Sequence, residues 1–109
     1  MKTDIRSQSF TITDAMRSFI QQRVRQAFGH FAEHIDRVEV RLTDINGPRG
    51  GIDKACRIVV RGPGLSLVVN DQDADAYDAA ARVLHRAGHA LTRRVKRRPP
   101  RPALAMAAV

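Results

Sequence analysis

The sequence has few of the residues on which several classes of protein depend. Its 109 residues include one cysteine, one tyrosine and no tryptophan. A single thiol cannot form an internal disulfide, which agrees with a reducing compartment. Cys56 lies in an apolar run, and this favours a buried strand residue over a nucleophile. The scarcity of aromatic side chains argues against a protein that stacks single-stranded bases on aromatic rings.

Long apolar runs are missing as well. No run approaches the ~20 residues of a membrane-spanning helix. The first residues, Met1 to Arg6, lack the apolar segment of a secretory signal. We therefore expect a cytoplasmic protein without a membrane partner. The length leaves room for one domain with a modest core, and a second, catalytic domain is excluded.

Acidic residues are absent from the last quarter of the chain. Residues 82–109 contain eight Lys or Arg and no Asp or Glu, whereas the two signs balance over residues 1–81. The net charge of +8 therefore comes entirely from this last quarter. A neutral body with one strongly cationic element predicts a polyanionic partner, which could be RNA, DNA or an acidic membrane surface.

The spacing of apolar residues predicts six elements of secondary structure. Residues 2–8 alternate as a half-exposed strand near a sheet edge does, and Thr13 followed by Asp14 predicts the start of a helix over residues 14–32. Gly29 lowers the stability of the last turn of that helix. Alternation then predicts three strands, which contain Val38, Val40 and Leu42, then Cys56, Ile58 and Val60, then Leu65, Leu67 and Val69.

A second helix is predicted over residues 75–97. Asp71 to Asp75 supply candidate N-caps, and Pro99 and Pro100 prevent the helix from continuing. The apolar face of this helix is predicted to contain Tyr77, Ala80, Leu84, Ala87, Leu91 and Val95.

The element order β-α-β-β-β-α predicts an α+β fold. The helix between the first two strands is a crossover, so those strands should be parallel, and the short later connections predict an antiparallel meander. Both helices should cover the apolar face of a four-stranded mixed sheet, giving a two-layer sandwich whose other sheet face stays polar. We expect residues 1–97 to form the domain and the Pro/Ala-rich residues 98–109 to form a flexible tail.

A basic stripe is predicted on the second helix. On a helical wheel centred on Arg82, the basic side chains fall opposite the apolar face. No carboxylate lies among them along the helix, although solvated helix faces normally mix both signs. Arginine predominates, which favours phosphate over a membrane surface. The predicted stripe consists of Arg82, His85, Arg86, His89, Arg93, Lys96 and Arg97.

Two histidine pairs could suggest a metal site. His30, Glu33 and His34 fit an H-x-x-E-H pattern, and His85 and His89 are four residues apart. The first pair falls where a helix should end, in a chain too small for a protease cleft. The second pair lies among cations, with no carboxylate nearby. We therefore favour surface or packing roles and expect no metal, no cofactor and no catalytic residues.

A glycine-rich loop, residues 47–51, is a weaker candidate for anion binding. Its backbone N–H groups and Arg49 could contact a phosphate. It lacks the Gly-Lys-Ser/Thr of a nucleotide-binding loop. A plain hairpin connection is favoured over an RNA-contacting loop, and Arg49 is kept as a candidate RNA contact.

Three features together resemble a known family. They are the β-α-β-β-β-α order, Thr13-Asp14-Ala15 at the start of the first helix, and Asp75-Ala76-Tyr77-Asp78-Ala79-Ala80 at the start of a basic second helix. In these features the chain resembles the ribosome hibernation-promoting factors and protein Y, over residues 2 to 97. From its length we expect the short form, without the C-terminal dimerisation domain of long members.

The resemblance implies a fold like the double-stranded-RNA-binding domain and a non-enzymatic function. It implies binding to 16S rRNA in the decoding region of the small subunit, where mRNA and tRNA would lie, so that translation is silenced under stress or in stationary phase. Basic positions of the family correspond to Arg86, Arg93 and Lys96. We expect no small-molecule substrate and a monomer when free. The alternatives are a generic RNA- or DNA-binding regulatory module and, third, a small metal-dependent hydrolase.

Overall fold

The computed structural model describes residues 1–9, 11–45 and 53–96. The predicted β-α-β-β-β-α order is confirmed, with a short 3₁₀ helix added after the first α-helix. In chain order the elements are β1 (Lys2–Gln8), α1 (Asp14–Phe28), η1 (Gly29–His34), β2 (Arg37–Asp44), β3 (Lys54–Gly62), β4 (Leu65–Asp73) and α2 (Ala76–Lys96). The proposed tail, residues 98–109, lies outside the described residues.

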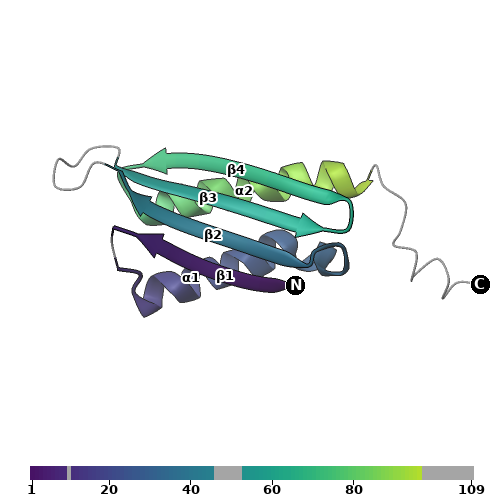
Figure 1. Ribbon diagram of the computed structural model, residues 1–109, viewed down its shortest axis with the longest axis horizontal. Coiled ribbons are helices and arrows are strands. Elements are labelled where there is room, and N and C mark those ends of the chain that lie inside the picture. Colours follow the sequence, from purple (N-terminus) through teal and green to yellow (C-terminus); the bar gives the residue numbers. More distant parts are fainter. Residues whose placement is uncertain (10, 46–52, 97–109) are drawn as a thin grey trace, which may run out of the picture.

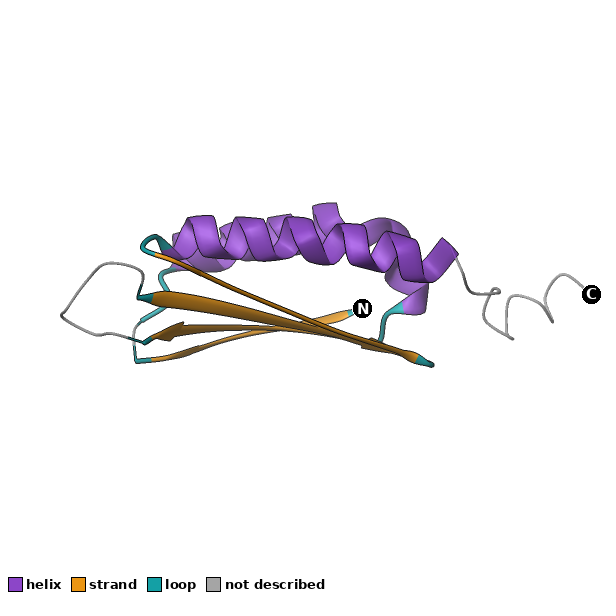
Figure 2. Cartoon of the chain, turned by 90° about the horizontal axis from the view of Figure 1, so that it is seen from above, coloured by secondary structure: helices purple, strands orange, loops and turns teal. Residues whose placement is uncertain are grey.

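The sheet has the predicted mixed topology (Figure 1). Its strands lie in the order β1-β2-β3-β4, with β1 parallel to β2 and the other two pairs antiparallel. Both helices lie on the same side of the sheet, so the chain forms a two-layer α+β sandwich (Figure 2). Among the residues that the structure describes, no layer covers the other face of the sheet.

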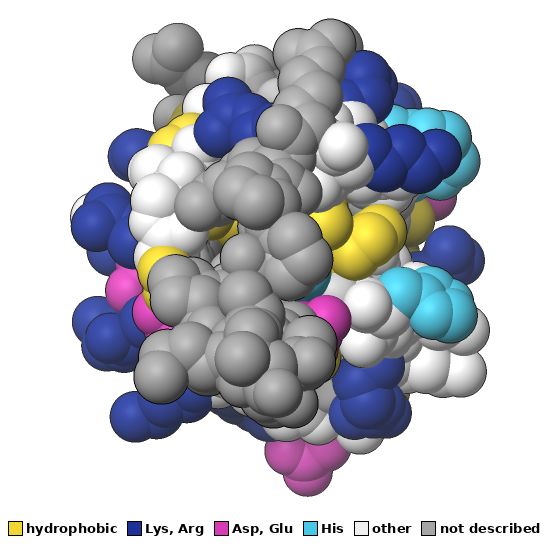
Figure 3. Space-filling model, turned by 90° about the vertical axis from the view of Figure 1, so that its right-hand side faces the viewer, with side chains coloured by type: hydrophobic (Ala, Val, Ile, Leu, Met, Phe, Trp, Pro, Cys, Tyr) yellow, Lys and Arg dark blue, Asp and Glu magenta, His cyan; other side chains and the backbone are white. Residues whose placement is uncertain are grey.

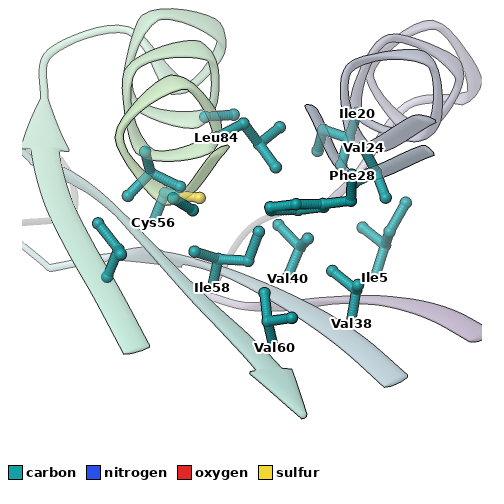
Figure 4. Packing of buried hydrophobic residues seen from close by; sticks show 14 of the residues in the cluster. Ile5, Ile20, Val24, Phe28, Val38, Val40, Cys56, Ile58, Val60 and Leu84 are labelled. Carbon is teal, nitrogen blue, oxygen red and sulfur yellow. The ribbon is translucent and has the colours of Figure 1, made fainter. Parts of the chain in front are cut away.

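The hydrophobic core lies between the two helices and the inner face of the sheet (Figure 4). Alternate residues of the strands, such as Val40 and Ile58, point towards Phe28 of α1 and Leu84 of α2, and all four are at most 1% exposed. Cys56 is buried among them, as predicted, and burial raises the pKa of its thiol to about 12. Cys56 therefore carries no thiolate at neutral pH and acts as a small apolar side chain.

The first helix ends earlier than the sequence suggested. The α-helix stops at Phe28 instead of residue 32, and the chain continues as η1, in which Phe31 has non-helical backbone angles. Gly29, a poor helix former, directly follows the last α-helical residue. The tighter turns of the 3₁₀ segment bring Ile35, which is 2% exposed, into the core before β2 begins.

Two glycines at the ends of the strands allow backbone arrangements that a side chain would hinder. Gly64 has φ 66° in the turn between β3 and β4, a conformation that most residues avoid. At Gly62 a Cβ atom would lie 2.0 Å from the carbonyl oxygen of His34. The absence of a side chain at Gly62 therefore lets the segment after η1 cross the end of β3, where the Asp36 N–H donates to the Arg61 carbonyl oxygen at 2.7 Å.

Candidate nucleic-acid interface

Asp75 begins the helix that presents the basic residues. Its Oδ1 accepts hydrogen bonds from the N–H groups of Tyr77 (2.7 Å) and Asp78 (3.3 Å). This is an N-cap, and a carboxylate at that position also interacts favourably with the helix dipole. Of the Asp residues that the sequence offered as caps, Asp75 fills the role.

The rotation of α2 about its axis is fixed by its apolar face. Ala80, Leu84, Ala87 and Leu91 are buried, as predicted. Tyr77 was expected in this face, but it is 36% exposed and makes an edge-to-face contact with Phe19 of α1, with ring centroids 5.1 Å apart. The described residues of the predicted stripe are all exposed on the other side of the helix: Arg82, His85, Arg86, His89, Arg93 and Lys96.

Two arginines of the stripe are paired, which corrects the expectation of a face without carboxylates. Arg82 Nε donates to Asp71 Oδ2 at 2.6 Å, and Arg82 Nη2 donates to Asp73 Oδ2 at 2.8 Å. Arg86 Nη1 donates to the Asn70 carbonyl oxygen at 2.9 Å and lies 3.2 Å from Asp71 Oδ2. The carboxylates come from β4, which continues to Asp73 and runs beside α2. Reasoning along one helix could not reveal them.

These ion pairs alter the titration of the carboxyl groups. The Arg82 guanidinium is the main cause that lowers the pKa of Asp71, with smaller contributions from the Gln72 N–H and from Arg86. The pKa of Asp73 is also lowered, first by the hydrogen bond from the Asp75 N–H and then by Arg82. Arg82 therefore fastens α2 to β4, and part of its charge is already compensated.

Of the stripe residues that the structure describes, Arg93 and Lys96 are the Arg and Lys side chains whose charge no neighbouring group compensates. Both are exposed, and within the described part of the chain neither side chain has a polar contact that would neutralise it. Neighbouring Arg94, which the sequence did not place in the stripe, donates to the Ser66 carbonyl oxygen. Arg97 and Arg49, the other two predicted contacts, lie outside the described residues.

A groove between α1 and α2 extends this surface, and sequence reasoning missed its α1 side. The groove has a volume of about 420 Å³. From the α1 side it is lined by Arg23, Gln26 and His30, and from α2 by His85 and His89, whose rings are 4.5 Å apart. Figure 3 shows histidine side chains on both sides of a hollow with apolar side chains at its base. Arg23 was not singled out because its own helix carries no basic stripe.

Among the histidines, His34 has a carboxylate beside it, because Glu33 Oε1 lies 3.6 Å from its Nε2. Over residues 1–9, 11–45 and 53–96, no group of three or more His, Cys, Asp or Glu side chains is arranged to hold a metal ion. Within the same residues, no helix is long and apolar enough to cross a membrane.

Comparison with known proteins assigns the family. The family model described as Sigma 54 modulation protein / S30EA ribosomal protein matches residues 3–99. The chain belongs to this family. It is therefore a ribosome-associated modulation factor of the hibernation-promoting group that the sequence resembles. A search among curated proteins finds no match.

Two solved structures share the fold. A ribosomal subunit interface protein from Coxiella burnetii has a TM-score of 0.75 and 17% identity, over 88% of this chain and 99% of that one. The Protein Y N-terminal domain of Thermus thermophilus has a TM-score of 0.70 and 22% identity, over 85% of this chain and 98% of that one. At these identities the likeness concerns the fold.

Proposed function

We propose that this member of the S30EA family binds 16S rRNA in the decoding region of the small ribosomal subunit. By occupying the places of mRNA and tRNA, it would silence translation under stress or in stationary phase. The protein acts as a binding module and carries out no chemical reaction. The observation that carries the proposal is the exposed pair Arg93 and Lys96 on α2, which has no carboxylate partner within the described residues, in a chain whose family is ribosome-associated.

The chemistry of this surface suits an RNA backbone. Arg93 and Lys96 are exposed at the C-terminal end of α2, and Arg23 of α1 lies across the groove from His85 and His89. Guanidinium groups donate two parallel hydrogen bonds to phosphate, and such charge-assisted bonds are about twice as strong as neutral ones. The groove combines Arg23 and Gln26 with three histidines and with apolar side chains at its base. Its basic and amide groups can donate hydrogen bonds to phosphate and sugar oxygens, which is how proteins position themselves on a nucleic-acid backbone.

Chemical probing of 16S rRNA in isolated small subunits tests the proposal. Bound protein should protect nucleotides of the decoding region, and an excess of generic duplex RNA should displace it only weakly. Protection confined to other parts of the subunit would contradict the proposal. Equal competition by any duplex RNA would instead indicate a general RNA-binding module.

A further inference from the structure

The uncovered face of the sheet carries a second set of basic side chains. The pairing register places them in two rows that cross the first three strands, with a row of two carboxylates and two valines between them. One basic row contains Lys2, Arg37 and Arg61, the other contains Arg6, Arg41 and Arg57, and the middle row contains Asp4, Glu39, Val59 and Val68.

The two carboxylates of the middle row form ion pairs with arginines on the same face. Asp4 Oδ2 lies 3.1 Å from both Arg6 Nη2 and Arg37 Nη2, and Glu39 Oε1 lies 3.3 Å from Arg37 Nε. Arg37 first, and then Arg6, lower the pKa of Asp4, so this carboxylate is charged at neutral pH. Asp4 and Glu39 therefore pair with Arg6 of β1 and Arg37 of β2.

Three arginines remain unneutralised: Arg41, Arg57 and Arg61. Within the described residues none of their side chains has a carboxylate partner, and all three are exposed. With Arg6, Asp4 and Glu39 they surround a hollow of about 170 Å³ beside Val59. The arginines therefore converge on one place and present donors around it.

In the absence of a ligand, the placement of these arginines lowers the stability of the sheet. Arg41 lies directly opposite Arg57 on the neighbouring strand, and like charges at opposite positions destabilise a sheet. The same strand pair shows the favourable alternative, because Asp44 lies opposite Lys54 with 3.4 Å between Oδ2 and Nζ. A requirement of folding does not account for Arg41 and Arg57, whereas an anionic ligand would relieve their repulsion.

We propose that the open sheet face, centred on Arg41, Arg57 and Arg61, is a second binding site for the phosphate backbone of RNA. One basic row extends about 10 Å across three strands at ~4.8 Å each, and the two rows lie about 13 Å apart at ~3.3 Å per residue. These dimensions fit several phosphates of a polymer. A membrane surface fits less well, because Val68 is the only exposed large apolar residue of the middle row in the described sheet.

The two basic surfaces lie on opposite sides of the molecule. α2 and the open sheet face belong to different layers of the sandwich (Figure 2). Viewed from one end, Lys and Arg side chains gather on both sides, whereas the histidines are on the helix side (Figure 3). The sheet site goes beyond the proposed function, because it lets one chain contact two separate RNA segments at the same time.

The number of RNA molecules bound per chain tests this inference. Analytical ultracentrifugation with a short labelled duplex RNA at low salt should give two duplexes per wild-type chain. The triple change Arg41→Gln, Arg57→Gln and Arg61→Gln should leave one, and so should Arg93→Glu with Lys96→Glu on the other side. The control change Arg17→Gln with Arg25→Gln, on exposed positions of α1 outside the groove, should leave two.

The outcomes separate the two proposals. A triple variant that melts like the wild type and binds the same number of duplexes would overturn the sheet site, and a protein partner would then be the better candidate for this face. If the triple variant loses all RNA binding while the Arg93→Glu, Lys96→Glu variant keeps its binding, the result would support the sheet site and contradict the α2 surface. If the triple variant fails to fold, Arg57→Gln alone should weaken the sheet site about tenfold, and unchanged affinity would overturn the inference.

Discussion

The carboxylates of β4 determine how individual arginines of α2 behave. Arg82 is held by Asp71 and Asp73, whereas Arg93 is free of such partners within the described residues. An arginine that is already paired must exchange one anion for another when it binds phosphate. Arg82 thus contributes to the stability of the fold, and Arg93 is the better candidate for binding.

Replacing Asp71 by Asn should destabilise the protein in a pH-dependent way. Because Arg82 lowers the pKa of Asp71 in the folded state, ionised Asp71 stabilises the fold above its unfolded pKa of about 3.9, and this contribution is lost as the pH falls through the lower folded value. Thermal melts should show a lower Tm for the variant at pH 7 and a smaller difference near pH 3. An equal difference at both pH values would contradict this role.

Gly62→Ala should be destabilising because the new Cβ atom would collide with backbone. It would lie 2.0 Å from the His34 carbonyl oxygen, so the crossing segment must move. We expect a loss of about 1 to 3 kcal/mol in the free energy of unfolding, measured by urea denaturation. Gly88→Ala is the control, since its Cβ would meet Ala27 at an ordinary 3.5 Å. Similar stability for Gly62→Ala and wild type would show that the crossing is loose.

Among the elements, α2 has separate faces for packing and for binding. Leu84 is 1% exposed in the core, whereas the basic residues face solvent. Leu84→Ala should lower the free energy of unfolding by about 2 to 5 kcal/mol through a core cavity. RNA affinity per folded molecule should remain unchanged, which titration at a temperature well below the melting transition can measure. A large loss of affinity in fully folded protein would contradict this separation.

Periodicity revealed the elements because each of them buries one face. Leu84 and Leu91 could be assigned to the core from their spacing alone, and so could Val38 and Val40. The end of α1 was misplaced because Phe31 keeps the helical spacing while its backbone departs from the helix. Tyr77 kept the spacing too, but its ring lies at the rim against Phe19.

The site was less predictable than the fold, because its contacts join different elements whose relative placement the residue spacing does not give. The stripe on α2 could be read from one helix, but its pairing with Asp71 depends on the position of β4. Arg23 and His30 join the groove only through the packing of α1 against α2. The basic rows of the open sheet became visible once the strand register was known, since the register decides that Arg41 of β2 lies opposite Arg57 of β3.

In the whole molecule, the α2 surface is the part that we propose to bind the small subunit. A change at Arg86 would also disturb its contact with Asp71, whereas Arg93 and Lys96 have no such contact in the described residues. Reversing their charges therefore probes binding with little effect on folding, and Glu has a helix propensity similar to that of Arg and Lys.

The most direct measurement is the affinity of Arg93→Glu with Lys96→Glu for isolated small subunits, by filter binding. Two lost charge-assisted contacts at about 1.5 kcal/mol or more each predict at least a hundredfold weaker binding. The control Arg17→Glu with Arg25→Glu makes the same change in net charge on α1, outside the groove, and should bind within a few-fold of wild type. If the α2 variant melts like the wild type and binds as tightly as the control, the α2 surface is not where this protein meets the ribosome.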